Sequence, residues 1–322
     1  MRVLSAAITL ALATGMISAQ TRNPKDDPKQ IGSRDVSKCL NMYSLEREMA
    51  LGKQLAEEVS RQVKLVDDPL ITEYVNRLGQ NLARNSDAKV PFTFQVIDGP
   101  TDVNAFAMPG GYVFVYTGLI KMADEEDELA GAMAHEIAHV AARHLTCRAS
   151  KQELMSYGSI PLGILLPGWG GYAARQAAGM GRALASQSFS RRDESDADYL
   201  GLQYMYAAGY DPNGAISIFE KLEALEKQKP GTFSRLLATH PMDSDRIAAT
   251  QKEIDRILPS KPEYVVTTSE YRQLRDRVMA LEGRRKADPK DDKPTLRVNP
   301  GANSGDPDDD GRPTIKRRDP IE

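Results

Sequence analysis

The sequence predicts an α+β fold that is mainly α-helical, with a small antiparallel sheet beside a central helix. Most of the chain between residues 44 and 282 carries apolar residues at spacings of three and four, the pattern of amphipathic helices. Two short segments instead alternate and are rich in aromatic and β-branched residues, as strands are. The second of them follows Pro109-Gly110-Gly111, a turn-forming sequence.

The predicted elements follow one another along the chain. The first helix, 44–64, begins at Ser44, a residue type that caps helix N-termini. The second opens at Pro69, where the missing N–H costs nothing. The strands are predicted at 92–97 and 112–116. Later helical patterns cover 125–148, which is predicted as one continuous helix, and then 194–208, 213–227, 243–257 and 269–282.

Both ends of the chain differ from this middle part. Residues 1–19 place a basic residue before a short apolar run and end in small residues, the layout of a secretory signal peptide cleaved after Ala19. The run is too short to span about 30 Å of hydrocarbon, so we expect export to the periplasm or extracellular space, with no transmembrane segment in the mature chain. Residues 20–40 predict a flexible leader and 283–322 a disordered charged tail, because both have little to bury. One domain remains, at 41–282.

Composition argues against a nucleic-acid partner. Hydrophobic residues make up 41% of the chain and charged residues 27%, with a net charge of -3. These values are typical of soluble globular proteins and lack the basic excess that nucleic acid attracts. The cysteines are Cys39 and Cys147. In an exported protein an even count permits a disulfide without requiring one.

The pentapeptide HEIAH, residues 135–139, lies within a strong helix pattern. A helix turns about 100° per residue, so His135 and His139 lie roughly 40° apart on one face and can reach one ion. Neutral imidazole suits Zn²⁺, and catalytic zinc sites use three protein ligands and leave a fourth position for water. Glu136 can take a proton from that water. Small apolar neighbours predict a buried helix, where His and Glu without partners would be costly. We therefore expect one zinc ion per chain.

Two patterns compete for the third ligand. One uses a His ten residues after the first, but Leu145 stands there. His144 lies about 180° around the predicted helix from His135 and is expected to pack or to cap the helix, not to share the ion. The other pattern takes a Glu from a later helix with an Asp four residues on, and Glu194 and Asp198 have this spacing. Glu194 is the expected ligand, and Asp198 the expected acceptor for the distal nitrogen of a ligating His.

Taken together, these motifs resemble a known family: the zinc metallopeptidases related to the CAAX prenyl-protein endopeptidases, the heat-shock protease HtpX and the Oma-type proteases. Segments 104–119, 127–144, 194–201 and 239–247 carry the resemblance. It is strongest to the soluble periplasmic branch that includes the β-barrel assembly-enhancing protease. The resemblance implies a compact, mainly helical gluzincin fold. The sequence departs from the family in lacking the transmembrane helices of membrane-bound members and a long helical-repeat domain after residue 258.

The resemblance likewise implies that His135, His139 and Glu194 are the zinc ligands, that Glu136 is the base and that Asp198 is the partner of a ligating His. It also adds further residues. His240 and Arg246 match polar active-site positions. His240 would either stabilise, with Arg246, the oxyanion that develops on the substrate, or occupy the fourth position on zinc until a substrate displaces it. A surface His beside a turn is the remaining interpretation. Asn104, Ala105 and Phe106 resemble the family's substrate-binding edge strand, where an extended peptide would add as another strand.

These residues predict a zinc-dependent endopeptidase that hydrolyses peptide bonds of misfolded or stalled envelope proteins, with Glu136 as general base. The expected partners are polypeptide substrates and envelope assembly proteins. The alternative is a zinc-containing chaperone or binding protein of the envelope with little proteolytic turnover. A Glu136→Gln variant separates the two, because an enzyme would lose its activity while keeping its metal and a binding protein would keep its effect.

Overall fold

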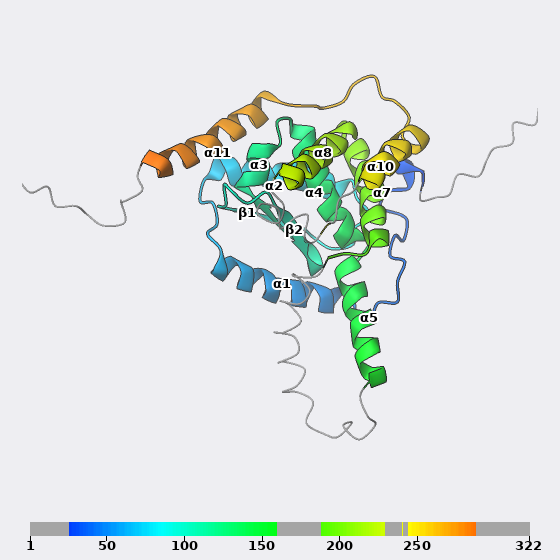
Figure 1. The fold of residues 1–322 in the computed structure, drawn as a ribbon. Coiled ribbons are helices and arrows are strands. Elements are labelled where there is room, and N and C mark those ends of the chain that lie inside the picture. Colours follow the sequence, from blue (N-terminus) through cyan, green and yellow to red (C-terminus); the bar gives the residue numbers. More distant parts are fainter. Residues whose placement is uncertain (1–25, 160–187, 229–239, 241–243, 288–322) are drawn as a thin grey trace, which may run out of the picture. The chain divides into compact units, whose positions relative to one another are not determined.

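A computed structural model describes residues 26–159, 188–228, 240 and 244–287 (Figure 1). The predicted signal peptide and nearly all of the predicted charged tail lie outside the described residues. The chain divides into two units between Glu282 and Gly283. The elements below belong to the first unit, except for the end of the last helix.

The first unit is mainly helical, as predicted. Bounds close to those predicted are found for α1 (Leu45–Gln62), α2 (Pro69–Arg84), α8 (Asn213–Gln228), α10 (Ser244–Ile257) and α11 (Ser269–Ala287). The hydroxyl of Ser44 caps α1 by accepting a hydrogen bond from the backbone N–H of Arg47. Helix α7 (Arg191–Ala208) starts before its predicted first residue, because Ser190 and Asp193 form a reciprocal capping box. A short helix, α3 (Thr117–Met122), adds to the predicted set.

The sheet has strands β1 (Thr93–Ile97), β2 (Ala105–Met108) and β3 (Tyr112–Tyr116) in the order β1-β3-β2. Strands β2 and β3 form an antiparallel hairpin through Gly110 and Gly111, whose φ values of 74° and 93° suit glycine. Strand β1 runs parallel to β3 on its other side, so the prediction of a purely antiparallel sheet was wrong for this pair. The reason is that β2, which has little strand character in sequence, is the hairpin partner of β3.

Helix α4 (Glu126–Ala141) forms the centre of the core, and every one of its residues is buried. Figure 1 shows it among α2, α7 and α8, all of which contact it, as does β2. Small residues allow a close approach between these helices. A Cβ atom on Gly201 of α7 would lie 3.2 Å from the backbone nitrogen of His135. The two helices that carry the predicted metal ligands therefore pack directly against each other.

The helix predicted over 125–148 is broken into two. Helix α4 ends at Ala141, and α5 (His144–Ser159) starts after Arg143, whose φ of 60° lies in the left-handed region. Contacts with a distant segment hold this conformation. The Nε of Arg143 donates to Oε2 of the buried Glu48 at 2.7 Å, and another guanidinium nitrogen donates to the carbonyl of Tyr43 at 2.5 Å. Since these contacts are tertiary, helical periodicity could not reveal the break. We call residues 142–147 the corner.

The segment 26–44, which we call the N-terminal strap, also differs from prediction. A flexible leader was expected through residue 40, yet from Asp26 onward the strap packs on the domain. Arg34 is buried, and its Nε donates to Asp87 at 2.9 Å while a terminal nitrogen donates to Gln203 at 2.7 Å. The strap has too little apolar surface to offset the conformational entropy lost when it becomes ordered. Buried, charge-assisted hydrogen bonds such as these supply the missing stabilisation.

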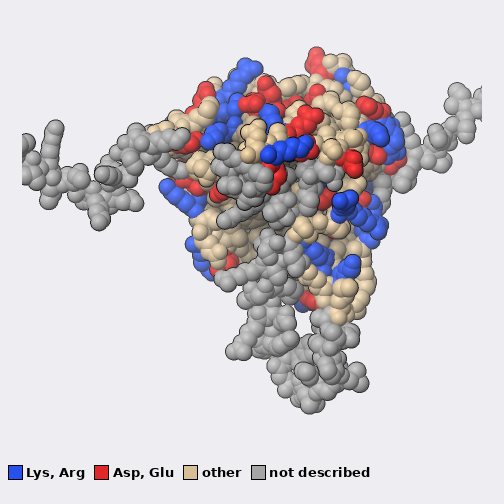
Figure 2. Space-filling model, in the orientation of Figure 1, with Lys and Arg blue, Asp and Glu red and all other residues tan. Residues whose placement is uncertain are grey.

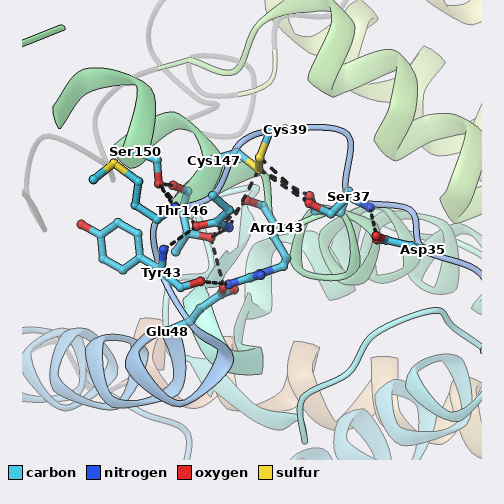
Figure 3. Close-up of a disulfide and its surroundings, with 12 residues drawn as sticks. Asp35, Ser37, Cys39, Tyr43, Glu48, Arg143, Thr146, Cys147 and Ser150 are labelled. Carbon is cyan, nitrogen blue, oxygen red and sulfur yellow. Dashed lines mark hydrogen bonds and ion pairs between the residues drawn. A yellow bond between two sulfur atoms is a disulfide. The ribbon is translucent and has the colours of Figure 1, made fainter. Parts of the chain in front are cut away.

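A disulfide ties the strap to the corner. Cys39 is bonded to Cys147, with their Cα atoms 5.8 Å apart (Figure 3). The pairing that the cysteine count permitted is therefore present. The bridge joins residues separated by 108 positions, and closing a loop of that size typically stabilises a folded chain by about 2–4 kcal/mol.

The surface of the described residues is mixed in charge. On the face drawn in Figure 2, Lys and Arg side chains lie among Asp and Glu side chains. Within the part of the chain that the structure describes, every helix is too short or too polar to cross a membrane.

Candidate metal centre

Helix α4 brings the two histidines of HEIAH together as their spacing predicted. The Nε2 atoms of His135 and His139 lie 3.0 Å apart, and both side chains are buried. The small residues around them let α4 run through the core, so neither imidazole faces water. Two imidazole nitrogens therefore converge on one point inside the protein.

Helix α7 supplies two carboxylates at this point. The Oε1 of Glu194 lies 3.5 Å from Nε2 of His139, and its Oε2 lies 3.5 Å from Nε2 of His135. One turn later, Oδ1 of Asp198 lies 2.9 Å from Nδ1 of His135. The structure thus places Glu194 among the imidazole nitrogens and Asp198 behind one of them, as the one-turn spacing predicted.

His240 joins the same cluster. Its Nδ1 lies 2.9 Å from Oε1 of Glu194 and 3.2 Å from Nε2 of His135, and the residue is buried. One donor atom from each of His135, His139, Glu194 and His240 falls within 4.8 Å of all the others, and we call these four residues the donor cluster. The buried position argues against a surface His beside a turn. The turn expected beside it lies outside the described residues.

The donor set fits zinc in chemistry and in size. Imidazole nitrogen and carboxylate oxygen are ordinary zinc ligands, bound at about 2.0–2.2 Å. Tetrahedral ligands at that distance lie roughly 3.3–3.6 Å from one another. The separations given above between Glu194 and the two histidines of α4 are 3.5 Å, and those involving His240 are 2.9 and 3.2 Å. A small tetrahedral ion could therefore be held here with little movement.

Glu136 lies beside the donor cluster. Its Oε2 accepts a hydrogen bond from the backbone N–H of Ala107 at 3.0 Å, and its Oε1 lies 3.4 Å from Nε2 of His240. Burial raises the pKa of the Glu136 carboxyl, while the nearby His240 and His135 oppose the rise. A carboxylate whose pKa is raised toward neutrality is suited to accept and return a proton.

The other protonation equilibria also suit a metal site. Burial would raise the pKa of Glu194, but the charge of His240 and hydrogen bonds from His135 and His139 hold it well below its usual range. Burial lowers the pKa of His139 and favours its neutral form. For His135, hydrogen bonds to Asp198 and Glu194 overcome the lowering effect of burial and raise the pKa to about 9. A metal binding to His135 would therefore displace a proton.

Arg246 of α10 holds both carboxylates of α7. Its Nε and one terminal nitrogen donate to the two oxygens of Asp198 at 2.6 and 2.8 Å, and another terminal nitrogen lies 2.7 Å from Oε2 of Glu194. A bidentate guanidinium contact fixes the orientation of a carboxylate. The expectation that Arg246 helps to stabilise an oxyanion does not match this arrangement, in which the guanidinium is directed at Asp198 and Glu194.

The predicted substrate-binding residues lie at an edge of the sheet. Ala105 and Phe106 belong to β2, and Asn104 precedes it. Since the carbonyl of Asn104 accepts from the N–H of Tyr116 on β3, alternation along the strand turns the backbone groups of Ala105 and Ala107 toward the open side. On that side the N–H of Ala107 reaches Glu136. The open edge of β2 therefore borders the donor cluster.

Two residues near the cluster were missed or misjudged from sequence. The Nδ1 of His144 lies 2.9 Å from Nδ1 of His139, because the corner turns His144 back toward α4. The ring centroid of Phe189 lies 4.0 Å from that of His139 and 5.0 Å from that of His240. The sequence signal that could have suggested Phe189 is an aromatic residue five positions before the expected ligand Glu194.

Known proteins match the chain over the same region. The model of peptidase family M48 matches residues 69–254. The beta-barrel assembly-enhancing protease of Escherichia coli (strain K12) is 30% identical over 266 residues, which is 80% of this chain and 53% of that protein. The protein of the same name from Yersinia pestis is 28% identical over 290 residues, 87% of this chain and 58% of the relative. The mitochondrial metalloendopeptidase OMA1 of Schizosaccharomyces pombe is 35% identical over 206 residues, 58% of this chain and 53% of the relative. The chain spans about half the length of these relatives.

Proposed function

The chain belongs to peptidase family M48, as its motifs predicted, and from that membership we propose that it is a zinc-dependent endopeptidase. The observation that carries the proposal is the convergence of four buried donor atoms on one point, with the carboxylate of Glu136 beside them. His135, His139 and Glu194 would hold the ion. The similar proteins named above are a protease and a metalloendopeptidase, which is consistent with this activity.

The protein's own groups would carry the proton transfers. Zinc, when bound, would supply Lewis acidity that polarises a carbonyl and makes water a better acid. Glu136 would accept the proton of the attacking water on its Oε1, since its Oε2 is occupied by the N–H of Ala107. As the C–N bond of the substrate breaks, Glu136 would return that proton to the leaving amine nitrogen. Asp198 would fix the orientation of His135, and Arg246 would fix both carboxylates of α7.

The open edge of β2 would bind the substrate. An extended peptide that pairs with the backbone of Ala105 would lie alongside Glu136. The reason is that the backbone groups of Ala105 face the same side of the strand as the N–H of Ala107, which Glu136 binds. Backbone pairing accepts many sequences, which suits a protease for unfolded chains. We therefore propose misfolded or stalled envelope proteins as substrates, which the protein would meet after its export. Since alternation turns the backbone groups of Asn104 and Phe106 toward β3, their contacts with the peptide would come from their side chains.

His240 is proposed to keep the site closed. Its Nδ1 stands where a fourth ligand would stand, its Nε2 lies 3.4 Å from Oε1 of Glu136, and the residue is itself buried. Because Nδ1 of His240 lies among the donor atoms, its position favours the blocking role over stabilisation of the oxyanion. His240→Ala should therefore raise turnover of an unfolded substrate several-fold while one zinc per chain is retained, measured as initial rates at equal zinc content. Lower turnover would instead support the oxyanion role, and unchanged kinetics would reject both.

The same closure favours the second candidate function, a zinc-containing chaperone or binding protein with low turnover. Both candidates are tested with an unfolded polypeptide whose two ends are blocked. An endopeptidase should produce internal fragments, identified by mass spectrometry. Binding of the polypeptide without any fragments, including by the His240→Ala variant, would support the chaperone and contradict the protease.

A further inference from the structure

The two histidines of α4 differ in what lies behind them. An imidazole that binds zinc through one nitrogen carries its proton on the other, and a partner for that N–H fixes both the tautomer and the direction of the ring. Behind His135 stands the carboxylate of Asp198, whose Oδ1 lies 2.9 Å from Nδ1. His139 places its Nε2 in the donor cluster, and its Nδ1 lies 2.9 Å from Nδ1 of His144.

We propose that His144 is the positioning residue for His139. With its own proton on Nε2, neutral His144 accepts a hydrogen bond at Nδ1 from the Nδ1–H of His139. This contact directs Nε2 of His139 at the ion. The inference rests on the proposed function, because it assumes that His139 is a zinc ligand. A histidine acceptor differs from the carboxylate behind His135 in adding no negative charge to the centre.

The break in the helix is what makes this contact available. In a continuous helix, residues five apart lie about 140° from each other around the axis, so His144 would point away from His139. The left-handed conformation of Arg143 interrupts the helix, and α5 starts at His144. A non-glycine residue in this conformation is strained and persists where surrounding contacts determine it.

Contacts with the N-terminal side hold the corner, and three of them can be followed in Figure 3. Arg143 donates to Glu48 of α1 at 2.7 Å. The hydroxyl of Thr146 donates to the same carboxylate oxygen at 3.0 Å. Cys147 is bonded to Cys39 of the strap. The corner that carries His144 is therefore held by a buried charge and by a covalent bond, and Phe189 packs near both His139 and His144.

The test compares two substitutions that differ in hydrogen bonding. His144→Asn keeps an acceptor oxygen near the position of Nδ1, whereas His144→Leu has similar bulk and no acceptor. Zinc affinity is measured by competition with a chromophoric chelator on the full chain with its disulfide intact. His144→Leu should bind zinc about 10–100-fold more weakly than the wild type, the usual effect of losing such a partner. His144→Asn should stay within a few-fold of the wild type.

Equal affinity of His144→Leu and the wild type would overturn the proposal, as would equal weakening by both variants, which would indicate packing alone. A wild type that binds no zinc would reject the proposed function and is distinguishable from either result. The tautomer provides a test that needs no variant. Long-range ¹H–¹⁵N spectra of the zinc-loaded wild type should show the proton of His144 on Nε2. A proton on its Nδ1 would contradict the inference.

Discussion

Glu136→Gln should abolish most proteolysis while leaving the metal in place. The amide oxygen can still accept the N–H of Ala107, so the side chain keeps its position, but an amide cannot take a proton from water. Loss of a general base typically costs 10²–10⁴-fold, and we expect kcat to fall by about 10³-fold or more at unchanged zinc content. The measurement is the rate of internal cleavage of an unfolded polypeptide.

A control on the same helix separates this effect from damage to the fold. Glu126 is also buried on α4, nine residues before His135, and it accepts a hydrogen bond from Tyr210 at 3.0 Å. Glu126→Gln should retain turnover within about twofold. If Glu136→Gln kept wild-type turnover, Glu136 would not be the base. If it kept a biological effect without turnover, the binding-protein alternative would gain support.

Glu194→Ala should lose its zinc. The carboxylate of Glu194 contributes a donor atom 3.5 Å from each imidazole nitrogen of α4, and without it two histidines and His240 remain. Three imidazoles can hold zinc with water in the fourth position, but this set would require His240 as a ligand and would replace an anionic carboxylate with a neutral nitrogen. We expect dialysed Glu194→Ala protein to contain far less than one zinc per chain by elemental analysis, and to be inactive.

A neighbouring acidic residue on α7 provides the control. Asp196 pairs with Lys38 of the strap, outside the donor cluster. Asp196→Asn should retain its zinc. In the Glu194→Ala variant Arg246 still has both oxygens of Asp198, so helix α7 should stay folded, as circular dichroism can check. Full zinc occupancy of Glu194→Ala would reject Glu194 as a ligand.

The parts of the site that were predictable from sequence depend on local geometry. His135 and His139 converge because four residues make about one helical turn, and the same holds for Glu194 and Asp198. Strong N-terminal signals, such as Ser44, placed helix starts to within a few residues. The family resemblance added His240, which periodicity alone could not have placed in the cluster.

The parts that were not predictable depend on contacts between distant segments. The left-handed Arg143 is held by Glu48 and Tyr43, so an unbroken apolar pattern conceals the corner and the contact of His144 with His139. Strand β1 pairs in parallel with β3 because β2, and not β1, is the antiparallel hairpin partner of β3. The strap is held in place by the buried contacts of Arg34 and by the disulfide, and amino-acid composition alone predicts neither.

The central claim is that a zinc ion held by these residues is required for peptide-bond hydrolysis. The most direct test follows internal cleavage of an end-blocked unfolded polypeptide by the purified full chain as isolated, after removal of metal by a chelator, and after addition of one equivalent of zinc. We predict cleavage in the first sample, little in the second and recovery in the third. Cleavage that continued unchanged after metal removal would contradict the account.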